Sequence, residues 1–369
     1  MEHPENNDAY KGLKVNAGVE APGVVNPYLA TMRRKRAAQL SVNDYVQGVL
    51  RGDVTVLSRA VTLLESVLPE HQAMAQEVVE KCLPHSGNSL RVGITGVPGA
   101  GKSTSIDAFG VHLLSHTGGK LAVLAVDPSS ERSKGSILGD KTRMERLAAN
   151  PRAFIRPSAS AGSLGGVARK TRETIILCEA AGYDNIFVET VGVGQSETAV
   201  YSMVDFFLLI QIAGAGDELQ GIKRGIMEMA DGIVINKADG ENAEEARRAA
   251  VHYRNALQLF PMPAVGVRPK VLTYSGFFDN GVGDVWNMID EYVALARSTG
   301  CFDERRAHQQ RYWMHEAVEE QLKARFYNAP GMAELLSRYE QLLLQGKVTS
   351  FAAASKVLEY FDKCGNGTL

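Results

Sequence analysis

Apolar residues recur with two different periods along this chain, and the change of period divides it into segments. Over residues 41–81 the apolar positions come at steps of three and four, as in Val42, Tyr45 and Val46, which predicts two or three amphipathic helices. Asp53 lies directly before the second helical stretch, where a carboxylate can accept hydrogen bonds from the free amides of a helix start. We therefore expect a helical segment ahead of the central part of the chain.

Between residues 90 and 275 short apolar runs alternate with helical stretches. The runs are mostly continuous rather than alternating, which is typical of parallel strands covered on both faces. The predicted strands are residues 90–95, 121–126, 153–156, 185–189, 205–212, 232–235 and 271–274. Strands and helices in this alternation predict an α/β fold with a doubly wound, mostly parallel sheet.

The last part of the chain is more polar and again has a helical period. Residues 304–327 and 331–362 predict two long amphipathic helices, separated by the breaker sequence Asn328-Ala329-Pro330-Gly331. At the other end, residues 1–40 are mostly polar with scattered Gly and Pro, and we expect them to form a disordered tail.

A glycine-rich string follows the first predicted strand and precedes a predicted helix. It fits the pattern G-x-x-x-x-G-K-[ST] at every fixed position. Its glycines let backbone amides approach phosphate oxygens, and these amides form an anion site with the helix N-terminus. We expect Lys102 to reach the β- and γ-phosphates, Ser103 to bind Mg²⁺ and Thr104 to support the α-phosphate side. The string reads Gly96-Val97-Pro98-Gly99-Ala100-Gly101-Lys102-Ser103.

A second motif, N-K-x-D, follows the predicted strand 232–235. Asp239 can accept hydrogen bonds from guanine N1–H and the 2-amino group, whereas adenine offers no such pair of donors. Two bonds to a charged acceptor, each about 1.5–3 kcal/mol, imply roughly 10²- to 10⁴-fold discrimination against ATP. We expect Asn236 to bond the base edge and brace the phosphate loop, the Lys237 stem to cover the ring, and a backbone amide at Ser275-Gly276 to reach guanine O6. Together the two motifs predict a P-loop protein that binds GTP and GDP.

Three carboxylates lie where a metal and a γ-phosphate would be held. Asp127 and Glu189 end predicted strands, the position at which open α/β sheets bind ligands, and Asp140 lies in the string 135–141. We expect Asp127, Asp140 and Glu189 to converge on Mg²⁺ and the attacking water and so to act in catalysis together with Lys102. The alternative, strongest for Asp140, is a helix cap or a surface acid. The glycine-rich stretches 192–196 and 213–221 are candidate switch loops.

Composition restricts the partners and the location. The formal net charge is −2 and 45% of the residues are hydrophobic, so no basic field favours nucleic acid or anionic lipid. The longest apolar run, residues 206–215, is too short to span a bilayer, which takes ~20 residues. The four cysteines are far apart in sequence, which favours a reducing compartment. The N-terminus has several acids and no apolar core, unlike a signal or transit peptide. We therefore expect a cytoplasmic protein, with no membrane or nucleic-acid partner. The cysteines are Cys82, Cys178, Cys301 and Cys364.

Several strings, taken together, resemble the MeaB/ArgK family of GTPases, which includes the methylmalonic aciduria type A protein. The resemblance runs from about residue 42 to 313 and beyond. Its most specific parts are I-L-G-D-K-T-R-M at 137–144 and E-T-V-G-V-G-Q-S-E at 189–197. Departures from the family pattern are Gly276 in place of Ala, the long polar N-terminal tail and the segment 131–134. The strings that carry the resemblance are residues 96–104, 125–130, 135–144, 188–198, 211–225 and 233–239.

The resemblance implies a SIMIBI-class GTPase with N-terminal helices and a C-terminal helical dimerisation arm. After the tail 1–40 we therefore expect an N-terminal helical segment 41–88, a P-loop GTPase domain 89–300 and a C-terminal helical dimerisation arm 301–369. The resemblance also implies a homodimer that serves as a chaperone for adenosylcobalamin-dependent methylmalonyl-CoA mutase or a related acyl-CoA mutase, gating cofactor loading and protecting the mutase. It assigns a third switch to residues 213–224. It also assigns Mg²⁺ binding and hydrolysis to the residues that match Lys102, Ser103, Asp127, Asp140 and Glu189.

Three other functions are weighed against this one. A nickel-insertion GTPase shares the fold, but it needs a Cys/His cluster near the switches, and the sequence shows none. A kinase that uses ATP, the role in older arginine and ornithine transport descriptions of relatives, is disfavoured by the residues 236–239. A dimeric scaffold with a vestigial pocket is disfavoured by the complete set of Lys102, Ser103, Asp127 and Glu189.

Overall fold

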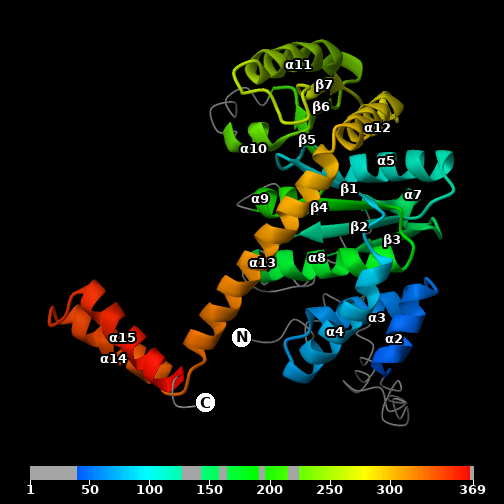
Figure 1. The fold of residues 1–369 in the computed structure, drawn as a ribbon. Coiled ribbons are helices and arrows are strands. Elements are labelled where there is room, and N and C mark those ends of the chain that lie inside the picture. The colour runs from blue at the N-terminus through cyan, green and yellow to red at the C-terminus, as the bar shows by residue number, and fades with distance from the viewer. Residues whose placement is uncertain (1–39, 127–142, 158–163, 191–195, 215–223, 366–369) are drawn as a thin grey trace, which may run out of the picture. The chain divides into compact units, whose positions relative to one another are not determined.

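Seven parallel strands form one sheet at the centre of the protein (Figure 1). The computed structural model describes residues 40–126, 143–157, 164–190, 196–214 and 224–365. The predicted tail 1–40 therefore lies almost wholly outside the described residues. All elements below belong to one unit of the chain, Val42–Leu369.

The sheet has the strand order β3-β2-β4-β1-β5-β6-β7. Every predicted strand is present, with ends that differ by at most one residue. β1 lies in the middle, because the chain first builds β2, β3 and β4 on one side of it and then β5, β6 and β7 on the other. This change of direction places the ligand-binding edge of the sheet at the carboxyl end of β1. The strands are β1 Leu90–Gly96, β2 Leu121–Val126, β3 Ala153–Arg156, β4 Asn185–Thr190, β5 Phe206–Ile212, β6 Gly232–Asn236 and β7 Lys270–Thr273.

Helices cover both faces of the sheet, which explains why most strands are apolar along most of their length. In β6, Val234 packs with the core beneath α5 and α12, whereas Ile233 and Ile235 pack with α10 and α11. The first face carries α5 Lys102–His116, α7 Glu145–Ala148 and α12 Val282–Ser298. The second face carries α8 Leu164–Ala180, α9 Ser196–Tyr201, α10 Arg224–Met229 and α11 Ala243–Leu257. The short 3₁₀ turn η5 is Gly240–Asn242.

In the described residues, three helices precede the sheet and pack against α8. They are α2 Val42–Leu50, α3 Val54–Glu65 and α4 Pro69–Cys82, followed by the 3₁₀ turn η3 Leu83–His85. Asp53 caps α3 as predicted, because its carboxylate accepts hydrogen bonds from Thr55 N at 2.8 Å and Val56 N at 3.2 Å. No helix in the described part of the chain combines the length and apolar composition that crossing a bilayer requires.

Helix α13, Cys301–Tyr327, is held to the sheet by buried ion pairs over its first half. Arg306 binds the carboxylate of Asp205, which is 1% exposed, at 2.7 Å and also donates to Ser89 O at 2.6 Å. Arg305 makes a second pair with Asp231 at 2.8 Å. Because Asp205 directly precedes β5, the first of these pairs fixes α13 to the amino-terminal edge of the sheet.

The prediction of one continuous helix over residues 331–362 is wrong. Two helices form instead, α14 Met332–Leu344 and α15 Ser350–Gly365. Gly346 has φ +69°, and its amide donates to Leu343 O at 2.9 Å while Lys347 N donates to Leu342 O at 2.9 Å. This bond pattern ends a helix at a left-handed glycine. Thr349 then starts α15, since its hydroxyl accepts from Ala352 N at 3.3 Å.

Arg306→Met is expected to lower the free energy of unfolding by about 3–5 kcal/mol, because it leaves the buried carboxylate of Asp205 without its charged partner. Urea unfolding followed by circular dichroism measures the change. Arg311→Met, on the exposed side of the same helix, serves as the control and is expected to stay within ~0.5 kcal/mol of the parent. Equal stability of the two variants would contradict the anchoring role of Arg306.

Candidate functional site

The predicted phosphate loop lies between the end of β1 at Gly96 and the start of α5 at Lys102. Its shape requires glycine at two positions. A Cβ on Gly96 would lie 2.1 Å from Ile210 O, and a Cβ on Gly101, which has φ +85°, would lie 2.7 Å from Asn236 Nδ2. The loop therefore fits closely against β5 on one side and against the predicted base-reading motif on the other.

Lys102 lies folded over its own loop. Its ammonium donates to Gly96 O at 2.8 Å and to Val97 O at 3.3 Å, and the side chain is buried. Burial lowers the pKa of Lys102 from its ordinary value, while the carboxylates of Glu189 and Glu197 oppose that shift. The ammonium thus lies inside the loop with two carboxylates nearby.

Ser103 and Glu189 meet across the edge of the sheet. The Ser103 hydroxyl donates to Glu189 Oε1 at 3.2 Å, joining the first residues of α5 to the end of β4. A hydroxyl and a carboxylate are oxygen ligands of the kind that Mg²⁺ takes, so these two side chains fit the ion. In the described ranges, no three His, Cys, Asp or Glu side chains are grouped so as to hold a metal on their own. The other two predicted carboxylates, Asp127 and Asp140, lie outside the described residues.

Three polar side chains that the site prediction did not include lie buried on neighbouring elements. Ser196 Oγ and Glu197 Oε2 at the start of α9, and Gln211 Oε1 near the end of β5, are buried without a hydrogen-bond partner among the described residues. Buried polar atoms are normally paired, so unpaired ones suggest a missing ligand, ion or water. Glu197 could have been found from its position, since Ser196-Glu197 follows a glycine-rich loop at the start of a helix.

Asn236 joins the two predicted motifs. Its Nδ2 donates to Ala100 O in the phosphate loop at 2.8 Å, and its Oδ1 accepts from Gly276 N at 3.0 Å. Lys237, the next residue, has φ +59°, a left-handed conformation that is uncommon outside glycine. One side chain therefore sets the position of the phosphate loop relative to the segment expected to face the base.

Asp239 and Ser275 lie together at the predicted base-reading end. Ser275 Oγ donates to Asp239 Oδ2 at 2.5 Å, which orients the carboxylate. Gly276, a departure from the family pattern, has ordinary space for a methyl group, since a Cβ there would lie 3.4 Å from Ser105 Oγ. The Ala-to-Gly difference therefore leaves the backbone donors of this segment unchanged.

Ser105 and Tyr274 form a further link that the sequence did not indicate. The two hydroxyls lie 2.5 Å apart, and Ser105 Oγ also lies 2.7 Å from Gly101 O. Tyr274 is buried and stacks on Phe109 of α5, with ring centroids 5.4 Å apart. The end of the phosphate loop is thus tied to the segment after β7.

Arg146 clamps the loop that follows the predicted base contact. Its Nη1 and Nη2 bind the Asp279 carboxylate at 2.6 and 3.1 Å, and its Nε binds Asp107 of α5 at 2.6 Å. Asp279 has φ +52°, and the loop is closed by a bridge between Ser275 and Asn280. The bidentate ion pair helps to hold Asp279, in its left-handed conformation, and the surrounding loop in place.

Arg146→Ala is expected to raise amide hydrogen-exchange rates in residues 275–280 by about two- to fivefold, because a partly exposed ion pair contributes about 0.2–1 kcal/mol. Mass-spectrometric exchange on the folded protein measures this effect. The control is Arg247→Ala, which removes an exposed ion pair with Glu244 on α11. Unchanged protection of 275–280 would refute the clamp.

Comparison with known proteins shows which family this chain is similar to. Residues 57–331 match the family described as methylmalonyl-CoA mutase-associated GTPase MeaB. A probable GTPase of Mycobacterium tuberculosis is 49% identical over 320 residues, which cover 86% of this chain and 95% of that protein. The mitochondrial methylmalonic aciduria type A homolog of Mus musculus is 42% identical over 333 residues, covering 88% and 80%. The crystal structure of a LAO/AO transport system kinase is 35% identical with a TM-score of 0.69, covering 87% and 97%. This chain therefore belongs to the MeaB family of P-loop GTPases.

Proposed function

We propose that this chain is a Mg²⁺-dependent GTPase that controls cofactor loading and protection of an adenosylcobalamin-dependent acyl-CoA mutase, with methylmalonyl-CoA mutase as the first candidate. The observation that carries the nucleotide part is the double contact of Asn236 with Ala100 O and Gly276 N. That contact gives a phosphate cradle and a base-reading segment one fixed spacing. The mutase part is supported by the description of the family, which names a mutase-associated GTPase.

Guanine recognition is assigned to the side chains of Asp239 and Lys237 and to one backbone amide. Asp239, oriented by Ser275, accepts hydrogen bonds from N1–H and the 2-amino group of guanine. The Gly276 amide donates to Asn236 Oδ1 in this structure, so it reaches O6 only by exchanging that bond. The Lys237 stem covers one face of the base. Adenine offers neither donor, so the half-buried Asp239 carboxylate would be covered by the base without being paired.

Phosphate binding is assigned to the loop 96–103 with Thr104. In the arrangement described, Lys102 Nζ is bonded to Gly96 O and Val97 O, so it turns from these carbonyls to the β- and γ-phosphates when nucleotide binds. The amides of Gly99 and Gly101 and those at the start of α5 surround the phosphate oxygens, since Pro98 has no N–H and Ala100 N is bonded to Val97 O. Lys102 remains the main positive charge that this part of the loop supplies.

Hydrolysis is assigned to the cluster around Glu189. Ser103 and Glu189 would hold Mg²⁺ directly or through water, together with Asp127 and Asp140, which the family resemblance supports as ligands. The ion would neutralise charge on the β- and γ-phosphate oxygens. Glu197, whose Oε2 is buried and unpaired, is the side chain we propose to accept a hydrogen bond from the attacking water.

We propose that the C-terminal helices form the dimer contact, with residues 301–369 as the arm. The second half of α13 carries Met314, Val318 and Leu322 at four-residue spacing, and each of these side chains is more than half exposed. An apolar stripe on one helix face is expected to be covered in an assembly. A second copy of the chain is the partner that the family resemblance favours.

Asp239→Asn is expected to weaken GTP binding by at least ~10²-fold and to raise affinity for XTP, because the amide donates where guanine also donates but pairs with the 2-oxo group of xanthine. Competition titration of GTP, XTP and ATP measures the preference. Glu241→Gln, an exposed residue two positions on, is the control. A variant that keeps the parental preference for GTP would remove Asp239 from base recognition.

The partner proposal predicts that the purified chain co-elutes with adenosylcobalamin-dependent methylmalonyl-CoA mutase in the presence of a non-hydrolysable GTP analogue. It also predicts that the mutase keeps its activity longer when the GTPase and GTP are present. Lys102→Ala, which loses the phosphate contact, is expected to retain the fold but lose the nucleotide dependence. If neither co-elution nor protection occurs, the mutase role is wrong, whatever the outcome of the base-recognition experiment.

A further inference from the structure

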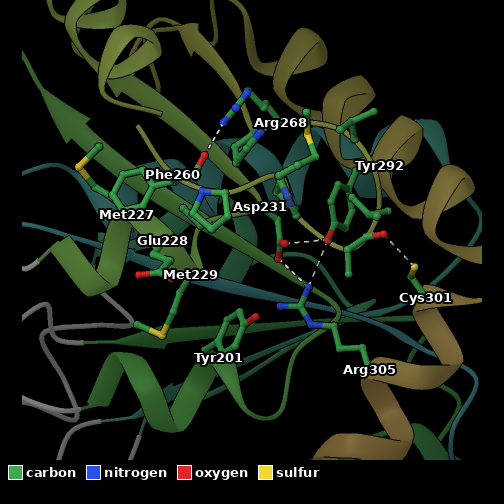
Figure 2. A pocket seen from close by; sticks show the side chains of 18 of the residues that line it. Tyr201, Met227, Glu228, Met229, Asp231, Phe260, Arg268, Tyr292, Cys301 and Arg305 are labelled. Carbon is green, nitrogen blue, oxygen red and sulfur yellow. Dashed lines mark hydrogen bonds and ion pairs between the residues drawn. The ribbon is translucent and has the colours of Figure 1, made fainter. Parts of the chain in front are cut away.

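A cavity of about 600 Å³ lies at the opposite edge of the sheet from the phosphate loop (Figure 2). Asp231, in its wall, directly precedes β6, whereas the phosphate loop follows the carboxyl end of β1 in the same parallel sheet. Walls come from α9, α10, the segment 258–269, α12 and α13. The volume is in the range of small-molecule sites, and nothing in the proposed nucleotide chemistry uses it.

Arg305 provides an unused hydrogen-bonding edge in this cavity. Its Nη1 binds Asp231 Oδ2 at 2.8 Å, and Tyr292 OH donates to the other oxygen of Asp231 at 2.7 Å (Figure 2). Its Nε and Nη2 are buried without a partner among the described residues. The Tyr201 ring lies under the guanidinium, with the ring centroid 4.7 Å from the guanidinium carbon. Buried donors are normally paired, and the Nε–Nη2 edge of arginine fits a carboxylate with two parallel hydrogen bonds.

The remaining walls define the rest of the ligand. Met227, Leu257, Phe260 and Val265 give the cavity apolar sides, which suit an aliphatic body. The exposed acids at its rim, Glu228 and Glu304, disfavour a ligand with several negative charges, such as a phosphate ester. A single carboxylate with a short apolar body meets all of these conditions.

We propose that this cavity binds a small monocarboxylic acid, with its carboxylate on the Nε–Nη2 edge of Arg305, and that it acts as an effector site for the GTPase. Entry requires the Tyr201 ring to move, because the edge it adjoins has no solvent access when the ring is in place. The effector part rests on the proposed GTPase function, whereas the binding part does not.

Helix α9 carries the effect from one site to the other. Tyr201 is its last residue, and its carbonyl accepts from Gln309 Nε2 at 3.4 Å. Glu197 lies one turn earlier, about 6 Å along the axis, and acts electrostatically on Lys102. A six-residue helix moves as one piece, so a shift of Tyr201 changes the position of Glu197 beside the proposed γ-phosphate site.

Isothermal titration of the nucleotide-free, full-length protein with sodium hexanoate tests the binding, with hexanamide as the uncharged match. Hexanoate is expected to bind at least tenfold more tightly than hexanamide. Arg305→Lys keeps a positive charge against Asp231 but removes the two-donor edge, and it is expected to weaken hexanoate binding about tenfold. Arg268→Lys is the control and is expected to bind hexanoate like the parent. Arg268 lines the same cavity, but its Nη1 donates to the carbonyls of Leu257 and Phe260.

A second variant, Ala264→Trp, fills the cavity from an exposed wall position and is expected to abolish hexanoate binding without altering Arg305. Equal binding of hexanoate and hexanamide, or no binding of hexanoate, overturns the site. If the parent does not bind hexanoate and Arg305→Lys loses the dimer, the Nε–Nη2 edge of Arg305 belongs to a protein contact, and the proposed ligand site is also overturned.

The effector part has its own readout. Hexanoate is expected to change the kcat of GTP hydrolysis at least twofold in the parent and in Arg268→Lys, and not in Arg305→Lys or Ala264→Trp. Binding without any change in kcat overturns the coupling through α9. A protein that binds hexanoate but never hydrolyses GTP refutes the proposed function and the effector role, while the binding site stands.

Discussion

The arrangement of the proposed nucleotide site depends on one amide side chain, that of Asn236. It donates to the phosphate loop at Ala100 O and accepts from Gly276 N, so two segments that are 176 positions apart are held at one distance. Gly101 makes this possible, because any side chain there would collide with the Asn236 amide. Phosphate binding and base recognition are therefore coupled, because a change that weakens the contact of Asn236 with Ala100 also shifts its contact with Gly276.

The sequence was sufficient for most of the fold. Most of the seven strands came from nearly continuous apolar runs, because a strand covered on both faces is apolar along most of its length, and 232–235 is a clear example. The cap at Asp53 was also predictable, since it depends on residues only two and three positions away. The break in the last helical segment was missed, although Gly346 and Thr349 carry local signals for an end and a start. Its apolar period continues through both helices and hid the interruption.

Contacts between distant segments could not be predicted from the sequence. The phosphate loop and the N-K-x-D string were visible because each is a local pattern with a fixed chemistry. The clamp of Arg146 on Asp279 and the link of Ser105 to Tyr274 depend on which loops the sheet brings together. Strand order decides that, and no local pattern encodes it. The proposed ligands Asp127 and Asp140 remain predictions, because they lie outside the described residues.

Helix α13 has one half that is clamped and one half that is not. Arg306 fixes it near its start, Trp313 Nε1 still donates to Ser202 O at 2.9 Å, and about 14 residues follow to Tyr327, a length of roughly 21 Å. A tilt of only about 10° at Trp313 displaces the far end by roughly 4 Å over that length. A small rotation of α13 at its anchored half therefore produces a much larger displacement at its far end, where α14 begins. Conversely, a partner that pushes on α14 and α15 would act on the ion pair of Arg306 with Asp205.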